Sequence, residues 1–156
     1  MVGGEPFVIS HPGEYEVKGV FVYGIAALEK ETTPTVPRQT IYRLEIGDMR
    51  IAHLGALTVV PREAIIERLA DCDILLLPVG GRGVALGARE AVDLIASLEP
   101  RVVIPTCFAL PGLKVALDPV EKFVKESGLT PETLERVKIT KKDLPSEETT
   151  LYILRA

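Results

Sequence analysis

Two almost purely apolar segments, each next to a stretch with helical periodicity, constrain the fold more than any other feature. They are DILLLPV at residues 73–79 and RVVIPT at residues 101–106. Strands of this composition are typical of sheets buried on both faces. Parallel strands need a crossover connection, and residues 87–100, GAREAVDLIASLEP, provide an amphipathic helix that Pro100 ends. This pattern therefore predicts strand–helix–strand units in the second half of the chain.

Further elements of the second half follow from caps and periodicity. Residues 60–70, VPREAIIERLA, predict a helix with Pro61 near its start. Residues 118–128, DPVEKFVKESG, predict another, with Asp118 as candidate N-cap and Gly128 just past the end. Residues 137–140 and 149–156 are expected to be the closing strands.

The first half of the chain has the period of strands. Residues 6–10 form a short apolar run that ends at the turn signal HPGE, and residues 15–28 alternate around Gly19. Residues 40–54 predict two strands joined by a tight turn at Gly47-Asp48. Residues 29–39 hold two prolines and many polar residues, so we expect an exposed loop. The whole pattern predicts a single α/β domain over residues 1–156, with antiparallel strands before the strand–helix–strand units.

Charge and length limit the partners. The chain has 156 residues and a formal net charge of -4, with a pI near 5.3. A nucleic-acid partner requires clustered Lys and Arg. The local basic cluster KITKKD at residues 138–143 is followed at once by acids, so we expect a solvated surface segment and no nucleic-acid partner.

Composition also sets the expected environment. The apolar run of residues 73–81 is broken by Pro78 and two glycines, and the first ten residues lack a signal-peptide pattern. We therefore expect a cytoplasmic protein without a membrane partner. Cys72 and Cys107 have no short Cys-x-x-Cys spacing, which fits a reducing compartment. The absence of Asn and a single Gln indicate a thermophilic source.

A series of motifs then points to a family. PGEYEVKGVFVYGI, TIYRLEIGDMRIAHLGAL, DILLLPVGG, LEPRVVIPT and KKDLPSEET follow one another from residue 12 to residue 149. In this order the chain resembles the metallo-β-lactamase superfamily, specifically the small Zn-dependent hydrolases of the β-lactamase fold related to ascorbate-phosphate lactonases. The resemblance covers residues 7–154. It implies a truncated αββα sandwich, equivalent to the C-terminal two-thirds of the family fold.

The same resemblance implies that the metal site is degenerate. The family's N-terminal His-x-His-x-Asp-His cluster has no counterpart here. HLGAL resembles a family His-Leu-Gly-Asp-Leu whose Asp bridges two metals, and that position is Ala56. IPTCF resembles a family Ile-Pro-Met-His-Tyr whose His binds metal, and that position is Cys107. Zinc needs three or four converging ligands. We therefore expect no zinc here, although full-length members carry it, and we assign no catalytic or metal-binding residue.

His53, Ala56 and Cys107 are the vestigial site positions. We interpret His53 as a residue packed near the sheet edge. Cys107 is either a small buried residue in the space of a lost histidine, or a surviving soft ligand or nucleophile.

Two other features have both a functional and a structural interpretation. The loop after residues 73–79 is a candidate anion-binding loop through Gly80, Gly81, Arg82 and Gly83, because it precedes a helix; it is otherwise a tight turn. Glu14 and Glu16 form either an acid–base pair or, as we prefer, alternating charges on a solvent-facing strand.

These observations lead to two functional hypotheses. The first is a divergent β-lactamase-fold protein without a catalytic metal centre, acting as a binding or assembly module. It would be a homo-oligomer, for example a homodimer, or bind a partner chain, because truncation uncovers apolar sheet surface. The second is a metal-dependent hydrolase of a small phosphorylated or lactone-like substrate, with ligands supplied by a missing N-terminal segment or a partner. The opening residues resemble mid-family sequence preceded by Met, which a late start codon would also produce.

Overall fold

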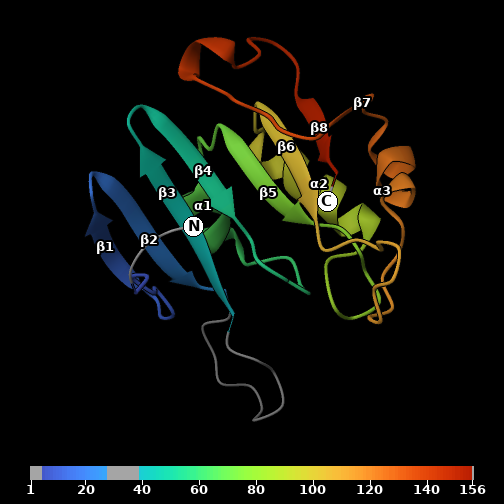
Figure 1. Ribbon diagram of the computed structural model, residues 1–156, viewed down its shortest axis with the longest axis horizontal. Helices are drawn as coiled ribbons and strands as arrows, with labels where there is room; N and C mark the ends of the chain where they lie inside the picture. Colours follow the sequence, from blue (N-terminus) through green and yellow to red (C-terminus); the bar gives the residue numbers. More distant parts are fainter. Residues whose placement is uncertain (1–4, 28–38, 156) are drawn as a thin grey trace.

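The computed structural model of the protein describes residues 5–27 and 39–155, and within these ranges the strands form one eight-stranded mixed sheet (Figure 1). The strands are β1 (Gly13–Val17), β2 (Val20–Ala26), β3 (Thr40–Ile46), β4 (Met49–His53), β5 (Ile74–Pro78), β6 (Val102–Thr106), β7 (Pro131–Leu134) and β8 (Thr150–Leu154). Their order across the sheet is β1-β2-β3-β4-β5-β6-β8-β7. The predicted sequence of antiparallel strands followed by strand–helix–strand units is confirmed.

Strands β1 to β4 form an antiparallel meander in which tight turns join β1 to β2 and β3 to β4. Val17 pairs with Val20 across a turn in which Lys18 and Gly19 both have positive φ, at 51° and 79°. Two successive residues with positive φ are typical of the hairpin turn whose twist matches the strands. Ile46 pairs with Met49 across the predicted Gly47-Asp48 turn. The first half of the sheet is therefore built from contacts that are local in sequence.

From β4 onward the neighbouring strands are parallel, and the helices lie on one face of the sheet (Figure 1). The helices are α1 (Glu63–Leu69), α2 (Ala88–Leu98) and α3 (Val120–Ser127). Buried side chains of the helices, such as Leu94 and Phe123, form one core with Leu75 and Val103 of the sheet. Helix α3 ends at Gly128, whose φ is 66°, as the sequence predicts. No helix in the described ranges is long and apolar enough to cross a bilayer.

A second, smaller core lies on the opposite face of the sheet. Ile74, Val102 and Ile104 are buried there against partly buried side chains from the segment of residues 135–149, including Val137, Ile139 and Leu144. We call this segment the strap. The described residues thus comprise one sheet, one helical layer and a strap, rather than the two sheets and two helical layers of a complete αββα sandwich.

Three local predictions are wrong. Residues 6–10 are not a strand, although the Ile9 carbonyl accepts a hydrogen bond from the Tyr42 hydroxyl at 3.0 Å. Residues 137–140 are not a strand either, because their apolar side chains pack on the face of the sheet instead of extending its ladder. The strand that extends the ladder beyond β8 is the polar segment β7 instead. Asp118 does not cap α3, since Pro119 occupies the N-cap position. The predicted loop at residues 29–39 lies, apart from Gln39, outside the described residues.

Candidate functional site

The vestigial positions lie at the end of the sheet where the parallel strands β4, β5 and β6 finish. We call this end of the sheet the ligand edge. His53 is the last residue of β4 and pairs with Leu76, while Pro78 and Thr106 pair at the ends of β5 and β6. The loops that follow these strands span residues 54–62, 79–87 and 107–119. Carboxyl ends of parallel strands are the usual place for ligand sites in α/β sheets. The sequence-predicted site residues therefore converge on an edge that suits a functional site.

His53 and Cys107 are linked through one glycine between them. The Gly55 backbone N–H donates to His53 Nδ1 at 3.0 Å, and the Cys107 thiol contacts the Gly55 carbonyl at 3.7 Å. Because Nδ1 accepts, Nε2 of a neutral His53 carries the proton. His53 is exposed and Cys107 is half-buried, so neither is packed away as fully as the structural interpretation expected. Cys107 also has a positive φ of 51°.

Ala56 is exposed at the same edge. Its carbonyl accepts a hydrogen bond from Gln39 Nε2 at 2.8 Å, so the backbone of the loop is fixed by a side chain from outside it. The methyl side chain offers no donor atom where the resemblance places a bridging carboxylate.

The backbones of the β5 and β6 loops are in close contact. A Cβ added to Gly80 would lie 2.0 Å from the Cys107 carbonyl oxygen, a separation that only glycine avoids here. The Asp118 N–H donates to the Gly80 carbonyl at 2.7 Å, and the Val79 N–H donates to the Thr106 carbonyl at 3.0 Å. This edge is therefore a rigid junction of two loops.

Asp118 links these loops through its side chain as well as its backbone. Its Oδ1 accepts from Arg82 Nε at 2.7 Å, and its Oδ2 accepts from Lys122 Nζ at 2.5 Å. The carboxylate is 11% exposed. The hydrogen bonds from Lys122 and Arg82 hold the pKa of the Asp118 carboxyl below its usual range. Asp118 thus ties the β5 loop to the start of α3.

The candidate anion-binding loop uses its own polar groups internally. The Arg82 guanidinium binds Asp118, and the Gly81 N–H donates to the Leu86 carbonyl at 2.9 Å. Gly81, Arg82 and Gly83 have positive φ of 58°, 56° and 73°, which accounts for two glycines in the turn. Anion binding by Gly80, Gly81, Arg82 and Gly83 stays a prediction, and an anion would compete with Asp118 for Arg82.

The donor set at this edge does not fit the two-metal centre expected of full-length family members. Cys107 Sγ and the His53 imidazole offer at most two donors, since His53 Nδ1 already accepts from the Gly55 N–H, and Ala56 contributes none. Among residues 5–27 and 39–155, no group of three or more His, Cys, Asp or Glu residues lies close enough to hold a metal ion. Structural and catalytic zinc sites alike take at least three protein ligands.

Apolar side chains surround the edge where a metal site would be polar. Six of the exposed large apolar residues lie on the three loops that follow β4, β5 and β6: Val59, Val60, Val84, Leu110, Leu113 and Val115. Their exposed fractions run from 39% for Val60 to 49% for Val59 and Val115. The three loops therefore expose several apolar side chains at this edge.

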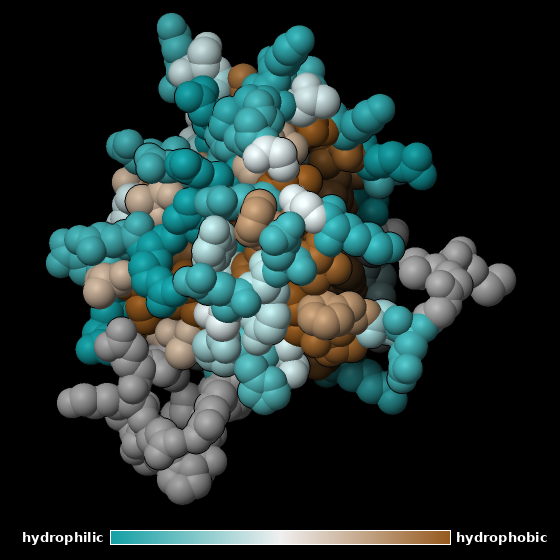
Figure 2. Space-filling view, turned by 90° about the vertical axis from the view of Figure 1, so that its left-hand side faces the viewer, coloured by the Kyte–Doolittle hydropathy of each residue, from teal (hydrophilic) through white to brown (hydrophobic). Residues whose placement is uncertain are grey.

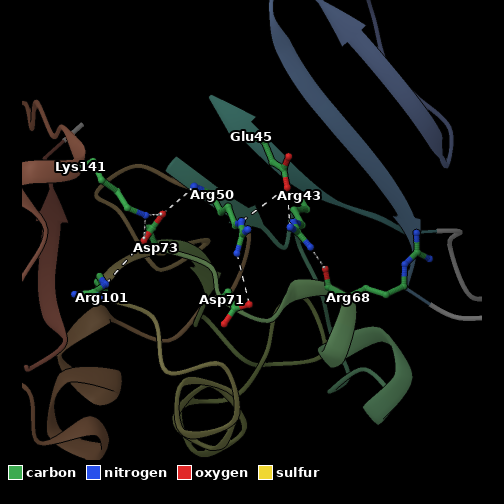
Figure 3. A network of polar contacts seen from close by, with 8 residues as sticks. All are labelled: Arg43, Glu45, Arg50, Arg68, Asp71, Asp73, Arg101 and Lys141. Atoms are coloured by element: carbon green, nitrogen blue, oxygen red, sulfur yellow. Dashed lines mark hydrogen bonds and ion pairs between the residues drawn. The ribbon is translucent and has the colours of Figure 1, made fainter. Parts of the chain in front are cut away.

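A polar network lies at the opposite end of the strands, where β5 begins (Figure 3). Asp73, 5% exposed, directly precedes β5 and accepts from Lys141 Nζ at 2.8 and 2.9 Å and from the Arg50 backbone N–H at 2.9 Å. Arg101 Nε lies 3.9 Å from its Oδ1. Lys141 is therefore an anchor of the strap, although residues 138 and 140–143 are exposed, as the prediction of a surface segment has them.

A cavity of about 310 Å³ lies beside this network, lined by Glu14, Tyr23, Ile25, Arg43, Glu45 and Arg68. Arg43 Nη2 donates to Glu45 Oε1 at 2.7 Å, and the Arg43 guanidinium lies 5.8 Å from the centre of the Tyr23 ring. Glu14 and Glu16 are both exposed, as the preferred interpretation of alternating charges expected.

The sequence did not reveal the roles of Asp73 and Asp118. Asp73 stands directly before a fully apolar strand, and an acid at that boundary is a usable signal for a buried anchor. Its partner Lys141 lies 68 residues away, which no local pattern indicates. The sequence around Asp118 has the pattern of a helix cap, and this pattern gave no indication of its contact with Arg82.

A comparison with known families decides the identity. Residues 1–107 match the β-lactamase superfamily domain, more than half of the chain. The chain belongs to this family. The predicted resemblance is confirmed.

Relatives of this β-lactamase superfamily chain come from Pyrococcus. A UPF0173 protein of Pyrococcus abyssi is 41% identical over 69 residues, which cover 44% of this chain and 31% of that protein. A protein of Pyrococcus horikoshii named UPF0173 metal-dependent hydrolase is 30% identical over 96 residues, 60% of this chain and 42% of that protein. The chain thus matches less than half the length of these curated relatives.

Solved structures of the superfamily share the fold. A metallo-β-lactamase superfamily protein of Thermotoga maritima superposes with a TM-score of 0.78 at 26% identity, over 96% of this chain and 73% of the other. The metallo-β-lactamase fold protein YhfI of Bacillus subtilis gives a TM-score of 0.60 at 11% identity, over 95% of this chain and 51% of the other. The second similarity concerns the fold alone.

Proposed function

We propose that this β-lactamase superfamily domain carries no catalytic metal centre of its own and acts as a binding or assembly module, as a homo-oligomer. One observation carries the proposal: at the ligand edge, Ala56 and Cys107 stand where the resemblance places a bridging carboxylate and a histidine. A dinuclear centre needs carboxylate charge to offset two dications, and Ala56 has none.

The surroundings of the edge support a binding role. The Gly80–Cys107 contact and the Asp118 ion pairs make it rigid, and exposed Val59, Val84 and Leu113 make it apolar. A rigid apolar surface buries area on binding without a large ordering cost.

Calorimetric titration of zinc into chelator-treated protein tests the proposal. We expect no saturable binding at micromolar zinc, and the Cys107→Ser variant should behave identically because two donors do not make a site. Saturable binding near one or two equivalents, lost in Cys107→Ser, would contradict the proposal.

A second candidate function is a metal-dependent hydrolase completed by another polypeptide. It is favoured by the name of the Pyrococcus horikoshii relative and by the fact that this chain matches 42% of that protein. Protein purified from its native source would then carry metal and a second polypeptide, whereas the chain produced alone would carry neither. Native protein that is metal-free and unaccompanied would exclude this candidate.

A further inference from the structure

The cavity beside Arg43 lies on the side of the sheet that the helices cover. The register places Glu14 opposite Tyr23 and Tyr23 opposite Arg43. The same row continues to Leu75, which belongs to the core beneath the helices. Strand β1 lies at the edge of the sheet, beyond the helices (Figure 1). Because Arg68 of α1 lines the cavity together with residues of β1, β2 and β3, the cavity lies between this helix and the first three strands.

An apolar floor and charged walls give the cavity a mixed chemistry. Ile25, 2% exposed, belongs to the main core, and Tyr23 projects from the same face of β2. Two acids and two bases supply the charges of the lining: Glu14, Glu45, Arg43 and Arg68. Hydrophilic side chains prevail on this side of the molecule, toward the left of Figure 2, whereas hydrophobic ones gather toward its right. The cavity volume of about 310 Å³ is at the lower end of the range for small-molecule sites, about 300–1,000 Å³.

Arg43 is held in one orientation by its neighbours in the cavity wall. Nη1 donates to the Arg68 carbonyl at 3.1 Å, and Nη2 donates to Glu45 Oε1 at 2.7 Å. The guanidinium lies 5.8 Å from the centre of the Tyr23 ring. Its Nε is the one buried side-chain nitrogen or oxygen in residues 5–27 and 39–155 that has no hydrogen-bond partner. Because buried donors in native proteins nearly always have a partner, Arg43 has one N–H left for an oxygen acceptor.

Two further charges at the cavity are unpaired. Among the residues that the structure describes, neither the Glu14 carboxylate nor the Arg68 guanidinium forms an ion pair or a hydrogen bond. Both residues are exposed, Glu14 on β1 and Arg68 near the end of α1. Figure 3 shows the Arg68 side chain extending away from Arg43. A negative and a positive group thus line one cavity without pairing with each other.

We propose that this cavity binds a free α-amino acid with an apolar side chain. The ligand carboxylate accepts from Arg43 and Arg68, and the ligand ammonium binds the Glu14 carboxylate, in charge-assisted hydrogen bonds. The apolar side chain of the ligand packs on Ile25 and Tyr23.

The spacing of the charged groups favours a ligand of this size. Neighbouring strands lie about 4.8 Å apart, and Arg43 leans over Tyr23, the residue between it and Glu14. The positive and negative groups of the ligand must therefore be only a few bonds apart, as they are in an α-amino acid. This inference goes beyond the proposed function and does not rest on it, because the residues that line the cavity are separate from His53, Ala56 and Cys107.

Titration of the purified chain with L-leucine, followed by amide NMR spectra, tests the proposal. Two matched probes each lack one charge: 4-methylpentanoate has no ammonium, and 3-methylbutylamine has no carboxylate. We expect saturable shifts of the Tyr23, Arg43 and Arg68 amide signals with L-leucine. Each matched probe should bind at least about 10-fold more weakly, because it leaves one charged group of the cavity without a partner.

Two substitutions remove the unpaired charges and keep the side chains similar in length, Glu14→Gln and Arg68→Met. Each should weaken L-leucine binding at least about 10-fold. Arg68→Met keeps the backbone carbonyl that Arg43 binds. Glu16→Gln is the control on the same face of β1, outside the cavity, and Arg89→Met is the control at an exposed position of α2. Both controls should bind L-leucine as the unmodified chain does.

The absence of saturable shifts up to tens of millimolar L-leucine would overturn the proposal. Equal affinity for 4-methylpentanoate would also overturn it, because the cavity would then bind a carboxylate without using Glu14. An affinity for L-leucine that survives both Glu14→Gln and Arg68→Met would place the ligand elsewhere, and so would an equal loss in the two control variants.

Discussion

At the edge where β4, β5 and β6 end, several residues hold the loops together through backbone contacts and ion pairs. Gly80 is a packing residue because the Cys107 carbonyl occupies the space of a side chain, and Ala56 contributes its carbonyl to Gln39. Asp118 contributes both a carboxylate and a backbone N–H. These residues fix the geometry of the edge.

Replacing Gly80 by alanine should destabilise the protein by about 2 to 3 kcal/mol, because its Cβ would overlap backbone that has little freedom to move. Gly83→Ala is the control in the same loop: its Cβ meets nothing within 4 Å, so only its φ of 73° costs about 1 kcal/mol. Urea denaturation measures both. Equal losses would show that the loops do not touch as described.

Asp118 should make the free energy of unfolding depend on pH in the acid range. Because its pKa is lowered in the folded state, the ion pairs stabilise fully above the unfolded pKa of about 3.9, and this contribution is lost as the pH falls through the lower folded value. The stability difference between the unmodified chain and Asp118→Asn should therefore be present at pH 7 and shrink toward pH 2. Denaturation midpoints at both pH values measure it, and a difference independent of pH would refute the assignment.

At the scale of elements, the strap is attached to the sheet by one buried acid. Asp73 binds Lys141, and Val137 and Ile139 pack on the sheet, so the strap is held by an ion pair at one edge and by apolar contacts on the face. Arg101 Nη1 adds a hydrogen bond to the Pro145 carbonyl at 2.6 Å.

Lys141→Met should destabilise the protein by about 1 to 2 kcal/mol, because it leaves Asp73 buried with fewer partners. The neighbouring Lys142→Met is a matched control and should change stability by less than about 0.5 kcal/mol. Guanidinium denaturation measures both changes. If the two variants lost the same stability, Lys141 would not anchor the strap.

The elements that the sequence predicted are those defined by local periodicity. Helix α2, strands β5 and β6, the Gly47-Asp48 turn and the Gly128 cap each depend on residues close together in the chain. The strand predicted at residues 137–140 failed because an alternating pattern fits a strap packed on a face as well as a strand in a ladder. Strand β7, PETL, was missed because it is polar and lies at the edge of the sheet. The ligand edge was predictable only through the family resemblance, and the Gly80–Cys107 and Asp118–Arg82 contacts were not predictable at all.

At the scale of the whole molecule, the composition predicts high thermal stability. The chain has no Asn and one Gln, the residues that deamidate on heating. We expect a thermal midpoint above about 65 °C, the upper end of the range for mesophilic domains. Differential scanning calorimetry measures it, and a midpoint between about 45 and 65 °C would contradict a thermophilic source.

The whole-molecule account depends on one claim, that a β-lactamase superfamily chain has kept its sheet and helices without keeping a metal centre. The metal content of the chain, produced alone and purified without chelator, tests it most directly through plasma mass spectrometry. The account predicts far less than one equivalent of zinc, iron or manganese, because the edge with His53, Ala56 and Cys107 has too few donors. About one or two equivalents per chain, the stoichiometry of the zinc sites of hydrolytic enzymes, would contradict it.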